Sequence, residues 1–362
     1  MKRVFHIITH LDVGGAERVA INLVRTDTEG IETHIVEVIR GRGAFSQQMI
    51  GELQEAGIRY NRSWLPLLFS WHYLCEKIVA SLFPFRMFWL WLRYRPDVVH
   101  CHTEIPDMAL WLSLKLMPWM RFRLVRTIHN TRLWTGMGFV GPRVERLMQR
   151  RRANIAISEG VRESYQQAYG ESAPIIFNGV EPSPQLGYDG LVTGKRNILF
   201  AGRLEEQKGI ATLVEIVRQM ESDPRYHFHI FGNGRLQPLV DAIADLKNVT
   251  VRPPLHNLSQ HIAAFDYVIM PSIHEGLSIL ALEASANKVP LLINRCAGLT
   301  DTLPPDWPLA VDNNDITQWT NLLRNTLTDS LHDETSDHAF HFVSTHFSIR
   351  GMQQSYEHFY NT

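Results

Sequence analysis

Short apolar runs alternate with longer amphipathic stretches along most of this chain, and the runs fall into two series. The first series lies at residues 4–8, 98–101, 124–128 and 153–157, and the second lies at residues 197–202, 227–232, 249–251, 267–271 and 290–294. Continuous apolar runs of this length are typical of strands buried on both faces of a parallel sheet, with helices as the connections. The alternation therefore predicts two doubly wound α/β domains.

Residues 178–195 separate the two series, are rich in proline and glycine, and have no helical or strand periodicity. We expect an N-terminal domain over residues 1–188 and a C-terminal domain over residues 189–345. A chain of 362 residues exceeds the size at which one hydrophobic core usually stops growing, so two cores are expected.

The formal net charge of −1 hides an asymmetry between the two halves of the chain. Residues 1–188 contain 23 Lys and Arg against 17 Asp and Glu, whereas the remainder contains 13 against 20. We therefore expect the N-terminal half to meet an anionic surface, and we expect no nucleic-acid partner.

Three features of the sequence favour a cytoplasmic location. The three cysteines, at positions 75, 101 and 296, form no CxxC motif, which argues against a disulfide framework or a zinc site. The N-terminus lacks the pattern of a signal peptide. The most apolar segment, residues 78–92, is interrupted by Pro84 and Arg86 and is shorter than the roughly 20 residues that a membrane span needs.

The loops that follow predicted strands are the expected ligand sites, because ligands of such sheets bind at the carboxyl ends of strands. In the first loop, Gly14 and Gly15 precede a predicted helix and allow close approach of an anion or a hydroxyl-rich ligand to the backbone. The alternative is that the pair forms only a turn, which is the more frequent use of two glycines between a strand and a helix. The loop does not match GxGxxG, so a dinucleotide-binding dehydrogenase is disfavoured.

Two cations flank the start of a helix in the next candidate loop, "GRLEEQKG". Arg203 and Lys208 would suit a pyrophosphate, because their charges and the helix N-terminus act on the same anion. The alternative is a solvated pair that is neutralised by Glu205 and Glu206. In a third loop, Gly232 and Gly234 would let a nucleotide base or ribose lie on the backbone, or they simply form a turn.

Two carboxylates stand in "HEGLSILALEASA". Glu275 follows a predicted strand and should lie at the carboxyl edge of the sheet. Glu283 falls within a helix that is apolar on all sides, which predicts that its side chain is buried. A buried carboxylate requires donors, either from the protein or from the two hydroxyls of a ribose.

Five motifs in one order, "GGAE", "IFNGVE", "GRLEEQKG", "FGNG" and "EGLSILALE", resemble those of the retaining glycosyltransferases of family 4. The resemblance implies the GT-B fold, in which two Rossmann-like domains face a central cleft. The ending "FSIRGMQQSYEHFY" is similar to the family's terminal helix, which crosses back to the N-terminal domain, and we assign residues 346–362 to it.

The resemblance also implies roles for individual residues. Glu283 would bind the ribose hydroxyls and Glu275 the hydroxyls of the donor sugar. Arg203 and Lys208 would neutralise the leaving diphosphate, so neither a metal ion nor a cofactor is expected. His129 would contact the transferred sugar, and Glu275, His129, Arg203 and Lys208 form the expected catalytic set.

Further donor contacts are implied for backbone groups of Gly15, Gly202, Gly232, Gly234, Gly276, Leu277 and Ser278. Many members of the family have glycine at the position of Ser278, which suggests altered donor contacts. Gly14 and His102 are expected on the acceptor side, with His102 in the wall of the cleft.

Seven of the nine tryptophans lie between residues 64 and 134, among many cations. The tryptophans are Trp64, Trp71, Trp89, Trp91, Trp111, Trp119 and Trp134, and the cations are Arg86, Arg93, Arg95, Lys115, Arg121, Arg123 and Arg126. This mixture suits a membrane interface. The alternative is that the aromatic residues belong to the core and the cations to a solvated face.

The expected activity is transfer of a hexose-type sugar from a nucleotide diphosphate sugar, expected to be UDP-linked, to a hydroxyl of a saccharide acceptor with retention of configuration. We expect the acceptor to be lipid-linked and the enzyme to lie peripherally on the inner face of the cell membrane. The expected role is in the biosynthesis of bacterial O-antigen, lipopolysaccharide or capsule. Two alternatives are a GT-B nucleotide-sugar epimerase and a catalytically silent carbohydrate-binding protein.

Overall fold

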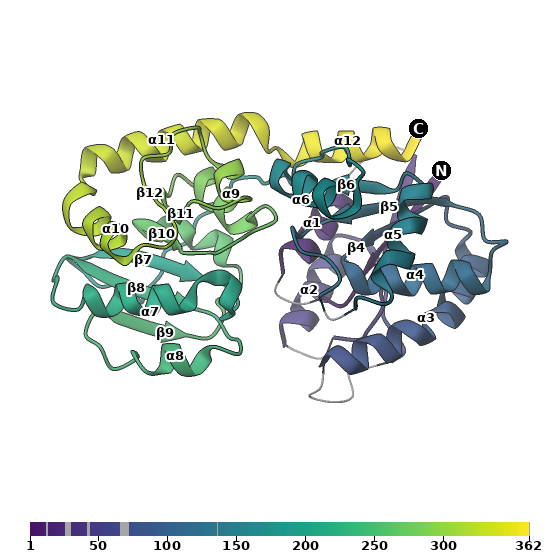
Figure 1. The fold of residues 1–362 in the computed structure, drawn as a ribbon, viewed down its shortest axis with the longest axis horizontal. Helices are drawn as coiled ribbons and strands as arrows, with labels where there is room; N and C mark the ends of the chain where they lie inside the picture. Colours follow the sequence, from purple (N-terminus) through teal and green to yellow (C-terminus); the bar gives the residue numbers. More distant parts are fainter. Residues whose placement is uncertain (12–13, 26–29, 42–43, 66–71, 136, 362) are drawn as a thin grey trace. The chain divides into compact units, whose positions relative to one another are not determined.

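The computed structural model describes the chain except for residues 12–13, 26–29, 42–43, 66–71, 136 and 362. It divides into two compact units, which are Met1–Gly179 with Ile349–Thr362, and Val180–Ser348. Each unit contains one parallel six-stranded sheet with helices on its faces (Figure 1). The predicted class, two doubly wound α/β domains, is confirmed.

The sheet of the N-terminal unit has the strand order β3-β2-β1-β4-β5-β6. Its strands are β1 (Lys2–Ile8), β2 (Ile31–Glu37), β3 (Arg59–Asn61), β4 (Val98–His102), β5 (Arg123–Ile128) and β6 (Asn154–Ala156). In the centre of the sheet, Phe5 of β1 pairs with His34 of β2 on one side and with Val99 of β4 on the other.

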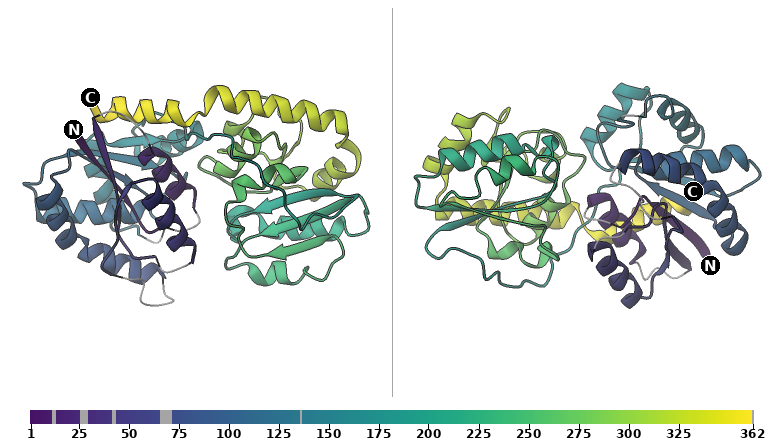
Figure 2. Two further views of the ribbon diagram at one scale, coloured as in Figure 1. Left: turned by 180° about the vertical axis from the view of Figure 1, so that it is seen from behind. Right: turned by 90° about the horizontal axis from the view of Figure 1, so that it is seen from below.

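Helices cover both faces of this sheet. They are α1 (Gly15–Val24), α2 (Ala44–Glu55), α3 (His72–Tyr94), α4 (Glu104–Leu116), α5 (Gly141–Arg150), α6 (Glu159–Tyr169) and α12 (Ile349–Asn361). One core joins the sheet to α3, α4 and α5, and a second joins it to α1 and α2. The last helix, α12, brings the two ends of the chain side by side (Figure 2), where Lys2 Nζ donates to the Tyr360 carbonyl at 3.1 Å.

The sheet of the C-terminal unit has the order β12-β11-β10-β7-β8-β9. Its strands are β7 (Arg196–Ala201), β8 (Tyr226–Phe231), β9 (Val249–Arg252), β10 (Tyr267–Met270), β11 (Leu291–Asn294) and β12 (Ala310–Val311). The helices are α7 (Ile210–Gln219), α8 (Gln237–Asp241), α9 (Ile279–Ala286), α10 (Ile316–Asn321) and α11 (Asp329–His346), with short helical turns η1 (Glu206–Lys208), η2 (Leu258–Gln260), η3 (Ile262–Ala264), η4 (Thr300–Thr302) and η5 (Leu322–Thr326). One continuous core fills the unit.

The apolar runs located nine of these strands, but β2, β3 and β12 were missed. β2 has the sequence IETHIVE, in which three polar residues interrupt the apolar run. β3 and β12 have three and two residues, which is too short for a periodic signal. β3 and β12 are also edge strands, which have a neighbouring strand on one side only.

The units change over at Gly179 and at Ser348, whereas the expected boundaries were residues 188 and 345. Residues 181–195 have no helix or strand, as expected for a linker, but they pack on the C-terminal unit. The Leu186 amide donates to the Gln260 carbonyl at 2.6 Å, and the ring of Tyr188 lies 5.4 Å from that of Phe265. These contacts place the segment within the C-terminal unit.

Candidate functional site

The order of the second sheet places a switch point between β7 and β10. The chain passes from β7 to β8 and β9 on one side, and then crosses to β10, β11 and β12 on the other. Ligands of open α/β sheets bind outside the carboxyl ends of strands at such a point. The loops that follow β7 and β10 carry the two predicted motifs, GRLEEQKG and EGLSILALE.

Lys208 and Glu275 meet at this switch point. Lys208 ends η1, directly before α7, and its Nζ lies 2.7 Å from Glu275 Oε1. The two side chains are 19% and 7% exposed, so the ion pair is largely shielded from water. Gln207 reinforces the junction, because its Nε2 donates to the His274 carbonyl at 3.0 Å and its carbonyl accepts from the Ile273 amide at 2.8 Å.

Lys208 therefore pairs with Glu275 and not with Glu205 or Glu206, the partners considered from the sequence. Glu205 instead accepts from Arg235 Nε at 2.8 Å. Arg203 is exposed, and its Nη2 contacts Gln207 Oε1 at 3.4 Å. One predicted cation is thus held by a buried carboxylate, while the other is open to solvent beside the same loop.

A third loop, after β11, supports the Glu275 segment. The Glu275 amide donates to the Ala297 carbonyl and the Ser278 amide to the Gly298 carbonyl, both at 3.2 Å. Gly298 has φ +78°, and a Cβ there would lie 2.5 Å from the Glu275 carbonyl oxygen. Sequence reasoning did not single out Gly298, although a glycine soon after a buried strand is the signal for such a close approach.

The glycines of the β7 and β8 loops allow the two loops to pack backbone to backbone. A Cβ at Gly232 would lie 2.2 Å from the Gly202 carbonyl oxygen, and a Cβ at Gly234 would lie 2.5 Å from the Leu204 carbonyl oxygen. The Leu204 amide donates to the Asn233 carbonyl at 2.7 Å. This packing alone requires glycine at 232 and 234, so the donor contacts expected for Gly202, Gly232 and Gly234 stay predictions.

Glu283 is half-buried, so the expectation of full burial was wrong. α9 is short, and its buried residues are Ala281, Leu282 and Ala284 to Ala286, while Glu283 lies between them on a partly open side. An apolar composition on all sides of a helix does not mean that the fold covers every face of that helix.

Ser278 caps the start of α9. Its hydroxyl accepts from the Ala281 amide at 3.3 Å, as an N-cap serine does. Its own amide is directed to Gly298, so this amide is less available to a ligand than the sequence suggested. Gly276 and Leu277, which precede the cap, are buried in the same loop.

In the N-terminal unit, Gly14 and Gly15 are exposed at the start of α1. Gly14 is the N-cap, with extended backbone (φ −159°), and Gly15 is the first helical residue. The two glycines therefore lie at the N-terminus of a helix, as the sequence predicted. The preceding residues 12 and 13 lie outside the described part of the chain.

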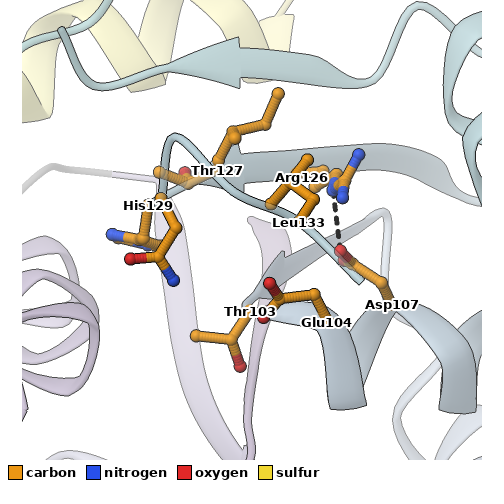
Figure 3. Close-up of a pocket in the computed structure, with 9 residues that line it drawn as sticks. Thr103, Glu104, Asp107, Arg126, Thr127, His129 and Leu133 are labelled. Atoms are coloured by element: carbon orange, nitrogen blue, oxygen red, sulfur yellow. Dashed lines mark hydrogen bonds and ion pairs between the residues drawn. The ribbon is translucent and has the colours of Figure 1, made fainter. Parts of the chain in front are cut away.

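A small pocket lies at the carboxyl ends of β4 and β5 (Figure 3). It is lined by Thr103, Glu104, Asp107, Arg126, Thr127, Ile128, His129, Asn130 and Leu133. Thr103 has φ +77°, which is uncommon for a residue with a side chain, and such strain is frequent at functional sites. His129 lines this pocket, whereas His102 is 1% exposed and is not part of its lining, and the expected place of His102 in the wall of the cleft stays a prediction.

Sequence reasoning missed the two carboxylates of this pocket, Glu104 and Asp107. Burial raises the pKa of Glu104, and burial also raises the pKa of Asp107, to about 7, although Arg126 opposes that shift. Arg126 donates to Asp107 at 2.7 Å and to Glu145 at 2.9 Å. The signal in the sequence was the position of Glu104 two residues after a buried strand, with Asp107 one turn later in the helix that follows.

The cluster of tryptophans and cations divides between core and surface. Trp134 is 5% exposed, Arg86 is buried with its Nη2 on the Asn61 carbonyl at 2.6 Å, and Arg126 is buried in its ion pairs, so these three do not belong to a membrane-facing surface. Trp71 lies outside the described residues. Trp64 and Trp119 are more than half exposed.

One side of α3 exposes an apolar stripe, which we call the α3 stripe. Its members are Ile78, Leu82, Phe85, Trp89 and Leu92, which are 44–73% exposed and recur at intervals of three or four residues. Exposed cations lie nearby in the sequence, and the Arg93 guanidinium lies 5.7 Å from the ring centre of Trp89. No helix in the described part of the chain is long and apolar enough to pass through a bilayer.

Two family models match the chain. Residues 13–183 match the model described as "Glycosyltransferase Family 4", and residues 195–329 match "Glycosyl transferases group 1". The D-inositol 3-phosphate glycosyltransferase of Arthrobacter sp. (strain FB24) is 24% identical over 263 residues, which are 63% of this chain and 62% of that protein. An uncharacterized 41.2 kDa protein in the cps region of Klebsiella pneumoniae is 22% identical over 228 residues, or 57% of this chain and 62% of the relative.

A solved structure, that of Anabaena Alr3699/HepE in complex with UDP and glucose, superposes with a TM-score of 0.77 over 100% of both chains at 15% identity. At this identity the likeness concerns the fold alone. The chain thus spans about three fifths of the length of the curated relatives above, but the full length of a structural neighbour.

Proposed function

Because the chain belongs to the family 4 glycosyltransferases and has the GT-B fold, we propose that it is a retaining hexosyltransferase that uses a UDP-linked sugar. The acceptor is a hydroxyl of a saccharide. The observation that carries this proposal is the Lys208–Glu275 ion pair at the switch point of the second sheet. UDP and glucose in the structural neighbour are consistent with such a donor.

Lys208 and Glu275 each have a separate role when the sugar donor binds. Lys208 directly precedes the N-terminus of α7, so a diphosphate placed there would attract it away from Glu275. The carboxylate of Glu275 is then released to accept hydroxyls of the sugar. Arg203, which is exposed on the same loop, adds a second charge to the diphosphate, and Glu283 accepts the ribose hydroxyls.

The chemical step breaks the bond between the anomeric carbon and the diphosphate oxygen and forms a bond to the acceptor oxygen. We propose attack on the face from which UDP leaves, which retains the configuration. The proton of the acceptor hydroxyl passes to the leaving phosphate. The protein supplies position and the positive charges that stabilise the departing anion.

We further propose that the acceptor is lipid-linked and that the enzyme binds the inner face of the cell membrane, in the synthesis of a bacterial surface polysaccharide. The α3 stripe supports this, since its exposed rings and aliphatic side chains lie on one side of a helix with cations nearby in the sequence. The similarity to a protein of a Klebsiella cps region is consistent with it.

One observation favours a second candidate, a nucleotide-sugar epimerase of GT-B fold. Such an enzyme needs acid and base groups in its N-terminal domain, and Glu104 and Asp107 line the pocket there with raised pKa values. The ion pair of Asp107 with Arg126 argues for a structural role for that carboxylate.

A panel of UDP sugars, incubated with and without saccharide acceptors, tests the proposal. We expect UDP release only with an acceptor, and NMR of the product should show the anomeric configuration of the donor. Lys208→Met should reduce turnover strongly, whereas Arg235→Met, which removes the neighbouring cation that pairs with Glu205, is the matched control. Isomerisation of the UDP sugar without an acceptor would favour the epimerase instead.

A further inference from the structure

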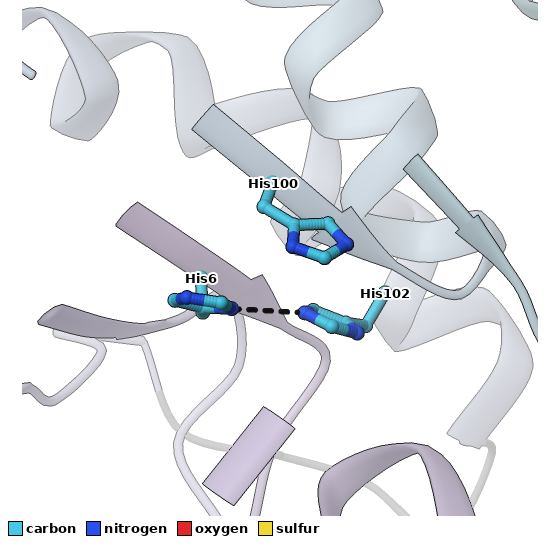
Figure 4. A group of neighbouring side chains, drawn as sticks. All are labelled: His6, His100 and His102. Carbon is cyan, nitrogen blue, oxygen red and sulfur yellow. Dashed lines mark hydrogen bonds between the residues drawn. The ribbon is translucent and has the colours of Figure 1, made fainter. Parts of the chain in front are cut away.

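Three histidines of the N-terminal unit form a hydrogen-bonded chain that ends at the pocket. His6 Nδ1 lies 3.2 Å from His102 Nε2, and His102 Nδ1 lies 3.3 Å from His129 Nε2. Figure 4 shows the rings of His6 and His102 edge to edge, with His100 beside them. His6 and His102 are each 1% exposed, and only His129 reaches the pocket lining.

All three rings are neutral at physiological pH. Burial lowers the pKa of His6 and of His129 to about 3, and it lowers the pKa of His102 well below its usual value. The titratable groups near the chain are His100 on β4 and Tyr360 on α12, whose rings lie near His6, and Glu104, Asp107 and Arg126, which line the pocket together with His129. Burial lowers the pKa of His100 and raises that of Tyr360, so both are neutral as well.

A neutral imidazole has one N–H, which couples the two hydrogen bonds. If His102 accepts from His6, it must donate to His129, and His129 then carries its proton on Nδ1. If His129 donates to His102, then His102 donates to His6, and Nδ1 of His129 becomes an acceptor. Among the described residues, no group bonds to Nδ1 of His129, the nitrogen at the pocket end of the chain.

We propose that His6 and His102 are positioning residues that hold the ring of His129 and let its Nδ1 switch between donor and acceptor without gaining charge. This inference rests on the proposed function, in which His129 contacts the transferred sugar. A sugar hydroxyl both donates and accepts, so a neutral group that can reverse its polarity matches either orientation of that hydroxyl. Reversal moves one proton along each of the two bonds toward His129. Every ring stays neutral because His129 Nδ1 releases its proton at the pocket while His6 Nε2 takes one up from water.

A metal site is the competing use of this cluster. One nitrogen from each of His6, His100 and His102 lies within 4.8 Å of the others, and neutral imidazoles are metal ligands. However, His100 already uses both nitrogens, at 2.8 Å from the Tyr360 hydroxyl and 2.7 Å from the Thr127 hydroxyl. The hydrogen bonds thus occupy the nitrogens that a metal would need. They favour the hydrogen-bonded chain of His6, His102 and His129, which we call the histidine relay, over a metal site.

Two substitutions at position 102 separate the two bonds. The amide of asparagine overlies Nδ1 of histidine, so His102→Asn keeps the contact with His129 and loses His6. The amide of glutamine overlies Nε2, so His102→Gln keeps the contact with His6 and loses His129. We expect turnover to fall at least about tenfold in His102→Gln and much less in His102→Asn, because a small misplacement of a positioned group is costly.

Imidazole ¹⁵N NMR provides a readout that does not depend on activity. In the wild type, His129 should stay neutral down to pH 5, and in His102→Gln its pKa should rise toward 6.5 as water replaces the lost contact. His229→Gln is the matched control, since it removes a buried histidine bonded to Asn197 at 2.8 Å in the other unit and should not shift the His129 signals.

Equal turnover and equal His129 spectra in the two position-102 variants would overturn the relay, and so would stoichiometric zinc bound by the purified protein through His6 and His102. Wild-type protein without transferase activity would count against the proposed function only. In that case the His129 spectra still decide whether the relay exists.

Discussion

Glu275 and Glu283 come from the same segment but differ in their surroundings. Glu275 is buried and paired with Lys208, whereas Glu283 is half-buried on α9. The sequence located both acids and their spacing. It did not give their burial, because apolar neighbours along a chain do not specify which face of a short helix the rest of the fold covers.

Removal of each carboxylate should therefore have a different effect. Glu283→Ala should weaken binding of free UDP by roughly 1.5–3 kcal/mol, for lost hydrogen bonds to a charged group. Glu275→Ala should leave UDP affinity nearly unchanged while turnover collapses, since its contact matters mainly as the sugar gains charge. Calorimetric titration of UDP, together with turnover rates, measures both effects.

Glu215→Ala is the matched control for these variants. Glu215 is a half-buried helical glutamate of the same unit, bonded to Gln219 at 2.9 Å, and its loss should alter neither quantity. If folded Glu283→Ala binds UDP like the wild type, Glu283 interacts with protein groups and has no role at the ribose.

Lys208 and Arg203 also predict the response to metal removal. Both are on the β7 loop, and together they supply two positive charges to a diphosphate without a divalent ion. We expect turnover in excess EDTA to stay close to its value in untreated enzyme. Loss of turnover on chelation that magnesium or manganese restores would contradict this account of the leaving group.

At the scale of elements, α3 shows where periodicity informs and where it misleads. The sequence predicted an apolar segment that does not span a membrane, but it assigned Arg86 to the surface, where the structure buries it against backbone carbonyls. A cation inside an apolar helix can serve the core as readily as solvent. Only the structure separates the α3 stripe from the buried side of the same helix.

The α3 stripe predicts binding to anionic vesicles. Phe85, which is 73% exposed, should insert into the interface, and Phe85→Ser should weaken sedimentation with the vesicles roughly tenfold, since burial of a large apolar side chain contributes about 1.5 kcal/mol or more. Binding should also fall at high salt, because exposed charges are screened over about 10 Å at 0.1 M.

Leu239→Ser is the control for that experiment, since Leu239 is 41% exposed on α8 of the other unit. It should sediment with the vesicles as the wild type does. Equal recovery of the wild type from neutral and anionic vesicles would show that the stripe has another partner.

At the scale of the whole molecule, the alternation of apolar runs was sufficient to predict two parallel sheets, and the order of the motifs was sufficient to predict the family. The change between units was located less well, because residues 181–195 lack periodicity yet pack on the C-terminal unit through contacts such as Leu186 with Gln260. The same lack of long-range information concealed the histidine chain. His6, His102 and His129 are far apart in sequence and meet only because β1, β4 and β5 are neighbours.

The distribution of buried histidines predicts that the two units respond differently to acid. In the N-terminal unit the pKa values of His6, His34, His100, His102 and His129 are lowered, and in the C-terminal unit those of His227 and His229 are lowered, in each case chiefly by burial. Below pH 6.5 the unfolded chain binds protons at these sites and the folded chain does not. The stability present above pH 6.5 is therefore lost as the pH falls toward the folded pKa of each histidine, by up to about 1.4 kcal/mol per pH unit where that pKa lies far below 6.5, as for His6 and His129.

Glu104 and Asp107 act in the opposite sense, because their raised pKa values make the folded N-terminal unit bind protons more readily, but the histidines outnumber them. Hydrogen exchange at pH 7 and pH 5, corrected for the intrinsic pH dependence of exchange, should show a larger loss of protection in residues 1–179 than in residues 180–348. His6→Gln should reduce that difference, since it removes one site whose pKa is lowered to about 3. An equal or greater loss of protection in the C-terminal unit would mean that the buried histidines do not control the acid sensitivity of this protein.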